Sequence, residues 1–167
     1  FCQMKYPNLN IKTIIVDDHS TNKNLDKIKN VINGKKIEIV SLNHEKYITR
    51  IKKQKTNETF SNLASLLQSF EIGRDNGDDL IFFTEDDYLH SKTMLEEMIA
   101  SYERIASQVG KDIFMCPSDY PFLYMNNEKT NILIGNNRHW RTINKTLCTF
   151  LTSKKLLKDY WENFLKT

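Results

Sequence analysis

The chain has 167 residues, of which 40% are hydrophobic and 27% are charged, and its formal net charge is +3. This length suits one domain with a substantial core, and the composition is that of an ordinary soluble globular protein. The apolar runs are shorter than the roughly 20 residues that span a bilayer, and the first residues lack a signal-peptide pattern. We therefore expect no transmembrane segment and a cytoplasmic protein, with peripheral attachment to a membrane as the alternative.

The basic residues are 19 lysines and 5 arginines. Nucleic-acid readers favour clustered arginine with interleaved aromatic residues, and this chain has no such cluster. The densest basic stretch, Arg50–Lys55, is typical of a solvated surface. We therefore expect no nucleic-acid partner. The three cysteines form no CxxC pair, which argues against a disulfide framework and a cysteine-based zinc site.

The first part of the chain predicts a strand, a helix and a second strand. Lys12–Val16 is a short run rich in β-branched residues, which favours a buried strand. Apolar residues recur at helical spacing over residues 25–32, and Lys36–Leu42 again favours a strand. A polar, lysine-rich connection follows.

The middle of the chain predicts two helices on either side of a strand. The amphipathic pattern from Asn57 onward predicts a helix that ends near Gly73. Leu80–Thr84 is almost wholly apolar, which predicts a central strand covered on both faces. A long helix is then expected, capped by Ser91 and closed by Gly110.

The last part predicts three short strands and a terminal helix. The strands are expected at Asp112–Cys116, Asn131–Gly135 and Thr146–Thr152. The amphipathic helix over residues 153–166 is expected to dock on the core, with a membrane-surface role as the alternative. Alternation of strands and helices predicts an α/β sandwich with a largely parallel sheet, and we expect a single domain over residues 1–167.

Acidic residues follow three of the predicted strands: Asp17 and Asp18, then Glu85–Asp87, then Asp119. Ligands of open α/β sheets bind at the carboxyl ends of the strands. Two like charges about 5 Å apart repel by on the order of 3 kcal/mol at an effective dielectric near 20, which a bound cation would offset. Mg²⁺ and Mn²⁺ prefer oxygen ligands and often bind carboxylates together with substrate phosphates. The alternative for each site is that aspartate merely forms turns and caps.

The expected ligand is thus a metal-bound di- or triphosphate. The sequence contains neither the P-loop pattern GxxxxGK[ST] nor GxGxxG, the usual glycine-rich phosphate cradles. Without such a loop, the "LIFFTEDD" run does not favour a P-loop nucleotide hydrolase.

Three stretches carry a family resemblance: "KYPNLNIKTIIVDDHSTNKN", "ETFSNLASLLQSFEIGRDNGDDLIFFTEDDYLH" and, after "SDYP", "HWRTINKTLCTF". In this order they resemble family 2 glycosyltransferases, and within that family a bacterial and viral-type branch. The resemblance implies a GT-A-like three-layer α/β/α sandwich with a mostly parallel central sheet. It also implies metal-dependent transfer of a sugar from a nucleotide-diphosphate sugar to the hydroxyl of a carbohydrate or other acceptor, with inversion.

The resemblance implies roles for the acids. Asp18, together with Asp17, would contact the nucleotide base. Asp86 would lie near the ribose or the metal, and Asp87 would bind the Mn²⁺ or Mg²⁺ that bridges the diphosphate. The family's common DxD form has an acid where this chain has Thr84. Asp86 and Asp87 must then suffice, and the neighbouring glutamate either adds a ligand or points the other way along the pleat.

Four later residues complete the expected site. Asp119 is the candidate general base on the acceptor hydroxyl, with a turn-forming role as the alternative. His139 would complete the metal shell or contact the diphosphate, and Arg141 would pair with a phosphate. Trp140 would stack on a sugar or base. The alternative for this segment is a surface loop with Trp140 packed inward.

In the family, another strand and helix precede the "YPN" segment, whereas this sequence starts at Phe1. Either the sheet lacks one central strand and part of its nucleotide pocket, or that part lies upstream. A non-catalytic remnant of a transferase, binding a nucleotide sugar or carbohydrate, is therefore a second interpretation. A third is a response-regulator receiver domain, which "IIVDDH" resembles. Its third strand would arrive after about 40 residues, but here the acidic strand end lies roughly 70 residues away.

Overall fold

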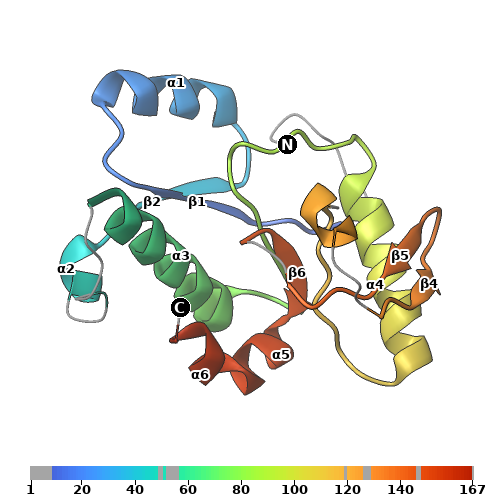
Figure 1. Cartoon of the computed structure of the whole chain (residues 1–167). Helices are drawn as coiled ribbons and strands as arrows, with labels where there is room; N and C mark the ends of the chain where they lie inside the picture. The colour runs from blue at the N-terminus through green and yellow to red at the C-terminus, as the bar shows by residue number, and fades with distance from the viewer. Residues whose placement is uncertain are drawn as a thin grey trace. The chain divides into compact units, whose positions relative to one another are not determined.

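The computed structural model divides into two compact units (Figure 1). The first comprises Phe1–Ile72 and Glu162–Thr167, and the second comprises Gly73–Trp161. The expectation of one domain over the whole chain stays a prediction. The structure describes residues 9–48, 51, 57–118, 120–125, 129–145 and 148–166, without the side chains at 57–59, 122 and 123.

A parallel pair of strands forms the centre of the first unit. β1 (Thr13–Asp17) and β2 (Ile37–Ser41) pair along their full length, and α1 (Asn22–Ile32) connects them. Figure 1 shows α1 and α3 (Asn57–Asn76) on opposite sides of this pair. Both strands and α1 confirm the sequence prediction. Since Asp17 pairs with Ser41, the residues that follow the two strands emerge at the same edge.

The core of the first unit joins α3 to a short helix that the sequence did not predict. α2 (His44–Ile48) lies within the stretch expected to be a connection. It buries Tyr47, whose hydroxyl donates a hydrogen bond to Glu71 Oε2 at 2.7 Å. The buried apolar residues of this cluster are Leu42, Tyr47, Ile51, Ala64 and Leu67.

In the second unit the described strands pair antiparallel. β3 (Leu80–Phe83) pairs with β6 (Phe150–Ser153), and β4 (Ile132–Ile134) pairs with β5 (His139–Arg141). The strand expected at Asp112–Cys116 is reduced to a single bridge to β6. The described part of the chain is therefore mixed α/β, as expected. A mostly parallel central sheet and a three-layer sandwich are not shown and stay predictions.

The helix α4 (Met94–Val109) supplies much of the core of the second unit. Its buried Met98, Tyr102 and Ile105 pack with residues of the strands, among them Leu133 and Trp140. The residue before the helix, Thr93, makes no capping hydrogen bond through its side chain, and Ser91 contributes only its carbonyl, so the expectation that Ser91 caps α4 is wrong. Gly110 ends the helix in the left-handed conformation, at a φ of 66°, as expected.

Two helices end differently from the prediction. α3 continues past Gly73 and ends at Asn76. Gly73 is thus not a helix stop; its lack of a side chain allows close packing, since a Cβ there would lie 2.7 Å from Cζ of Phe83. The terminal segment forms two short helices, α5 (Lys154–Asp159) and α6 (Trp161–Phe164). Leu157 is fully buried, so α5 docks on the core as expected. None of the described helices combines the length and the apolar character that crossing a membrane requires.

Candidate functional site

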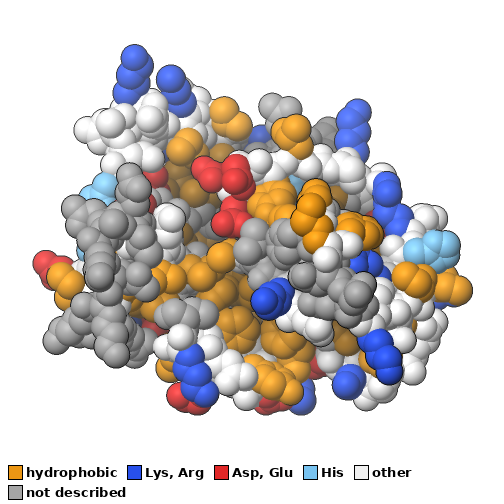
Figure 2. Space-filling model, viewed as in Figure 1, with side chains coloured by type: hydrophobic (Ala, Val, Ile, Leu, Met, Phe, Trp, Pro, Cys, Tyr) orange, Lys and Arg blue, Asp and Glu red, His pale blue; other side chains and the backbone are white. Residues whose placement is uncertain are grey.

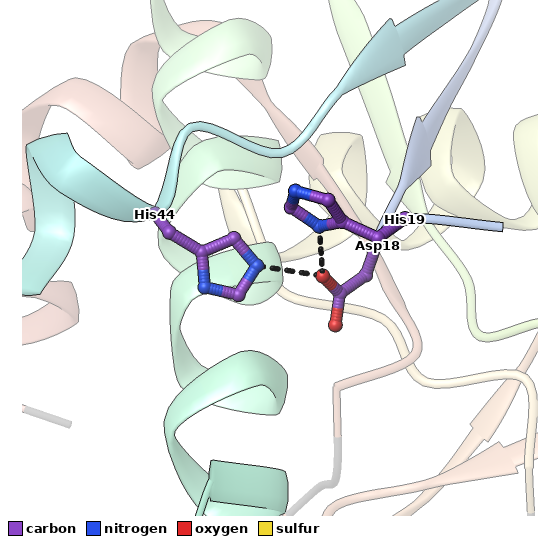
Figure 3. Close-up of side chains that lie close together, drawn as sticks. All are labelled: Asp18, His19 and His44. Carbon is purple, nitrogen blue, oxygen red and sulfur yellow. Dashed lines mark hydrogen bonds and ion pairs between the residues drawn. The ribbon is translucent and has the colours of Figure 1, made fainter.

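The two acids that follow β1 have different environments. Asp17 is buried and accepts a hydrogen bond from the Ser20 N–H at 3.1 Å, which stabilises the turn after the strand. Asp18 is solvent-accessible, and its Oδ1 lies 3.0 Å from Nδ1 of His19 and 2.7 Å from Nε2 of His44 (Figure 3). At the carboxyl end of β1, Asp18 therefore forms a group with two imidazoles.

Hydrogen bonds to Gln68 fix the segment that carries His44. The Asn43 N–H donates to Gln68 Oε1 at 2.8 Å, and Gln68 Nε2 donates to the Ser41 carbonyl at 2.9 Å. The Asn43 side chain in turn accepts a bond from the Lys46 N–H at 3.1 Å in the first turn of α2. The imidazole of His44 is thus held at the strand edge from which Asp18 emerges.

His19 has a φ of 57°, in the left-handed region that non-glycine residues seldom adopt. Its ring lies edge-on to the ring of His44, with the centroids 4.7 Å apart. The hydrogen bond from His19 holds the pKa of Asp18 below its ordinary value; burial opposes this shift, and hydrogen bonds from His44 and Ser61 add to it. Asp18 is therefore a carboxylate at neutral pH.

The ligand atoms of Asp18, His19 and His44 all lie within 4.8 Å of one another. Within the described ranges, no other set of three His, Cys, Asp or Glu side chains converges in this way. The sequence predicted Asp18 as a site residue and assigned no role to either histidine. The signal was present, because each histidine comes shortly after a predicted strand and parallel strands end at one edge.

In the second unit, Glu85 is turned toward the start of β6. The Glu85 N–H donates to Thr149 Oγ1 at 3.3 Å, and this hydroxyl lies 3.4 Å from Glu85 Oε2, as a donor to it. Thr84 adds a bond from its hydroxyl to the Glu85 carbonyl at 3.1 Å. These contacts orient the glutamate as part of the β3–β6 connection.

Asp86 and Asp87 lie in the turn that follows, and both are exposed. Their side chains form no hydrogen bond or ion pair with any other residue that the structure describes. Because they face solvent, their repulsion is closer to the roughly 1 kcal/mol expected in water than to 3 kcal/mol. The repulsion alone therefore does not require a cation, but both carboxylates are available to bind one.

Tyr88, the residue after Asp87, lines an open cleft with a volume of ≈ 810 Å³. The hydroxyl of Tyr88 forms a short hydrogen bond with that of Tyr120. Burial, together with this bond, raises the pKa of Tyr120, so the Tyr120 hydroxyl is protonated near pH 7. The lining is mixed polar and apolar and includes Tyr88, His90, Glu97, Ser118, Arg138 and Trp140.

Glu97 of α4 holds the wall of this cleft. Its buried carboxylate accepts hydrogen bonds from the Asn137 N–H and from Ser101 Oγ, each at 2.9 Å. Ser101 Oγ also accepts the Asn136 N–H at 2.9 Å. Burial raises the pKa of Glu97, but the hydrogen bonds from Ser101, Asn137 and Arg138 outweigh it and lower the pKa below its ordinary value. Nothing in the sequence singles out this residue, because it lies in an ordinary amphipathic helical pattern.

The predicted residues of the "HWR" stretch form β5. His139 is exposed, and the Arg141 guanidinium stacks on the ring of Tyr124 at 4.3 Å. Trp140 packs inward on the α4 core and also lines the cleft. The segment is a strand and not the surface loop of the alternative, and the role of Trp140 in stacking on a sugar or base stays a prediction. The buried Nε1 of Trp140 has no hydrogen-bond partner among the described residues.

The other expected ligands are less well placed by the structure. Asp86, Asp87 and His139 do not form a converging ligand group among the described side chains. Asp119 lies outside the described residues. Their assigned roles in metal binding and general base catalysis stay predictions.

Compared with protein-family models, with curated proteins and with solved structures, the chain matches none of them. The resemblance to family 2 glycosyltransferases therefore rests on the sequence motifs. Function is best argued from the chemistry of the site, since a fold alone does not specify it.

Proposed function

We propose that the chain is a metal-dependent glycosyltransferase of the GT-A type. It transfers a sugar from a nucleotide-diphosphate sugar to the hydroxyl of a carbohydrate or other acceptor, with inversion. The observation that carries the proposal is the Asp86–Asp87 pair. The two exposed carboxylates lie in the turn shortly after β3, have no side-chain partner among the described residues, and precede Tyr88, which lines an open cleft of ≈ 810 Å³.

Two adjacent carboxylates fit Mg²⁺ or Mn²⁺, which protein sites often hold through one or two acids plus substrate phosphates. Asp87 would hold the ion together with Asp86. When bound, the ion neutralises charge that develops on the departing diphosphate. Glu85, tied to Thr149, keeps the acidic turn in place.

The remaining roles belong to residues around the cleft and at β1. Asp18 contacts the nucleotide base, and Asp119 removes the proton from the acceptor hydroxyl. Arg138 lines the cleft, whereas Arg141 stacks on Tyr124, so Arg138 is the better-placed cation for a phosphate in this cleft. Trp140 presents an aromatic surface to the same space.

The test is calorimetric titration of nucleoside diphosphates with and without Mn²⁺, followed by turnover of the matching nucleotide sugar. Asp87→Ala should lower turnover at least about 100-fold, because a transition-state charge loses its counter-ion, while the melting temperature stays unchanged. Asp78→Ala, which removes an exposed acid just before β3, is the matched control. The proposal is wrong if no nucleoside diphosphate binds, or if Asp87→Ala binds metal and donor as the unaltered chain does.

The same titrations separate catalysis from binding alone. Mn²⁺-dependent binding of a nucleoside diphosphate, without turnover of any nucleotide sugar in a panel of bases and sugars, would support the non-catalytic alternative. That result would overturn the enzymatic part of the proposal and leave the metal and nucleotide site standing.

A further inference from the structure

We propose that Asp18, His19 and His44 form a second metal site, for a divalent transition-metal ion of the zinc class (Figure 3). The site lies at the carboxyl edge of the β1–β2 pair and uses none of the residues assigned to Mn²⁺ or Mg²⁺. It goes beyond the proposed function, which gives Asp18 a contact to a nucleotide base and gives the two histidines no role.

The spacing of the ligand atoms suits such an ion. Zinc binds histidine nitrogen at about 2.0–2.1 Å and carboxylate oxygen at about 2.0–2.2 Å, so tetrahedral ligand atoms lie about 3.3–3.4 Å apart. Asp18 Oδ1 is 3.0 Å from His19 Nδ1 and 2.7 Å from His44 Nε2. The separation between any two of these atoms is within 4.8 Å. Small side-chain rotations therefore suffice to place an ion between them.

The ligand types select the metal. Two imidazoles and one carboxylate suit Zn²⁺, Co²⁺, Ni²⁺ or Cu²⁺, whereas Mg²⁺ and Mn²⁺ prefer oxygen ligands. Both histidines direct a ring nitrogen at the same carboxylate oxygen (Figure 3). Without an ion, each nitrogen carries a proton in its hydrogen bond to Asp18. In the metal-bound state each of these nitrogens would present its lone pair to the ion, and the proton of each neutral imidazole would lie on its other ring nitrogen.

The site combines preorganisation with access. The Gln68 bonds fix the backbone around His44, and the His44 ring also contacts Phe60, with the centroids 5.4 Å apart. The side chains of His19, Asp18 and His44 are 69%, 33% and 32% exposed. An ion can therefore enter from solvent, and a water molecule can occupy the fourth coordination position.

The test is titration of the full chain with Zn²⁺ by calorimetry, and with Co²⁺ by visible absorption. We expect one Zn²⁺ per chain at this site, an intense Co²⁺ ligand-field spectrum that Zn²⁺ abolishes, and no displacement by excess Mg²⁺. His44→Ala and Asp18→Asn should each weaken Zn²⁺ binding more than the roughly 10–100-fold that loss of an outer-shell partner costs.

His19→Gly is the sharpest variant. Glycine adopts a positive φ without a steric penalty, so this change removes a ligand from a backbone that glycine suits. The variant should fold, as judged by circular dichroism and thermal melting, and still lose Zn²⁺. Glu45→Gln alters an exposed acid next to His44 that is not one of the three ligands, and this variant should bind Zn²⁺ as before.

Failure of this proposal is distinguishable from failure of the proposed function. If the unaltered chain binds neither Zn²⁺ nor Co²⁺, or if folded His19→Gly and His44→Ala bind them normally, the three side chains form a hydrogen-bonded group only. Asp87→Ala should keep Zn²⁺ binding while losing Mn²⁺-dependent turnover. Zn²⁺ binding that disappears in Asp87→Ala would place the ion at the acidic turn and overturn the assignment to Asp18.

Discussion

The Asn137 N–H donates a hydrogen bond to the buried carboxylate of Glu97 at 2.9 Å. The bond joins α4 to the turn between β4 and β5. Ser101 Oγ donates a second hydrogen bond of the same length to the other carboxylate oxygen of Glu97. Asn136, Asn137 and Arg138 line the cleft. One side wall of the cleft is thus held by a single acid that lies 40 residues away in the chain from its partner.

Replacing this acid should destabilise the second unit. Glu97→Gln keeps the shape of the side chain but presents an N–H group to donors, so buried donors lose their partner. Hydrogen bonds to charged groups contribute about 1.5–3 kcal/mol, and we expect a loss of that order in the free energy of unfolding, measured with urea. Glu96→Gln alters the exposed neighbour and should stay within about 0.5 kcal/mol of the unaltered chain. Equal effects of the two changes would contradict the role of Glu97.

The same residue predicts a pH dependence of stability. The pKa of folded Glu97 lies below its ordinary value of 4.5, so the folded state favours the carboxylate. The resulting stability is complete above the unfolded pKa and is lost as the pH falls through the lower, folded pKa. The urea concentration at the unfolding midpoint should therefore decrease as the pH is lowered below about 4.5. In Glu97→Gln the urea midpoint should decrease less steeply at acid pH. It should still decrease, because Asp18 also has a lowered pKa. The same pH dependence of the urea midpoint in the unaltered chain and in Glu97→Gln would contradict the prediction.

Local patterns predicted most of the elements. The strands β1, β2 and β3 coincide with apolar runs in the sequence, and α1 coincides with apolar residues at helical spacing. α2 was missed because it has five residues in a polar stretch, and only Tyr47 anchors it. β5 was missed for a similar reason: it has three residues, and its formation depends on pairing with β4. Short elements that depend on a distant partner leave little trace in local sequence.

The candidate site residues also fall into those that the local sequence predicts and those that depend on distant partners. Asp17, Asp18 and Asp87 could be placed near strand ends because each belongs to an acidic stretch that comes after an apolar run. The two predicted strands place both histidines near the edge where Asp18 lies, but the contact of both rings with one carboxylate oxygen depends on the parallel register of β1 and β2, which the local sequence does not specify. The role of Glu97 was beyond prediction, since the Asn137 N–H that it binds belongs to a turn 40 residues later in the chain.

Two glycines should respond differently to alanine. A Cβ at Gly135 would lie closer than 3.0 Å to the Trp140 ring and to Ser101 Oγ, and an indole held in the core cannot easily move. Gly135→Ala should therefore cost about 1–3 kcal/mol through overpacking. At Gly110 nothing lies within 4 Å, so alanine meets only the strain of the positive φ, about 1 kcal/mol. Thermal melting and tryptophan fluorescence separate the two cases, because only Gly135→Ala should change the emission of Trp140. An unchanged emission spectrum in a destabilised Gly135→Ala would show that the contact is not the cause.

Thr149 should position the acidic turn without touching a substrate. It is fully buried, and its hydroxyl both accepts the Glu85 N–H and donates to the Glu85 carboxylate. Thr149→Val keeps the shape but removes this link, at a cost of about 1 kcal/mol in stability. Given the proposed function, a looser turn displaces Asp86 and Asp87, and misplacement of about 1 Å can cost up to roughly 100-fold in rate. We expect Thr149→Val to raise the Mn²⁺ concentration needed for half-maximal turnover, and Thr149→Ser, which restores the hydroxyl, to recover it. If Thr149→Val shows the unaltered Mn²⁺ dependence while losing the stability, the hydroxyl supports the fold alone.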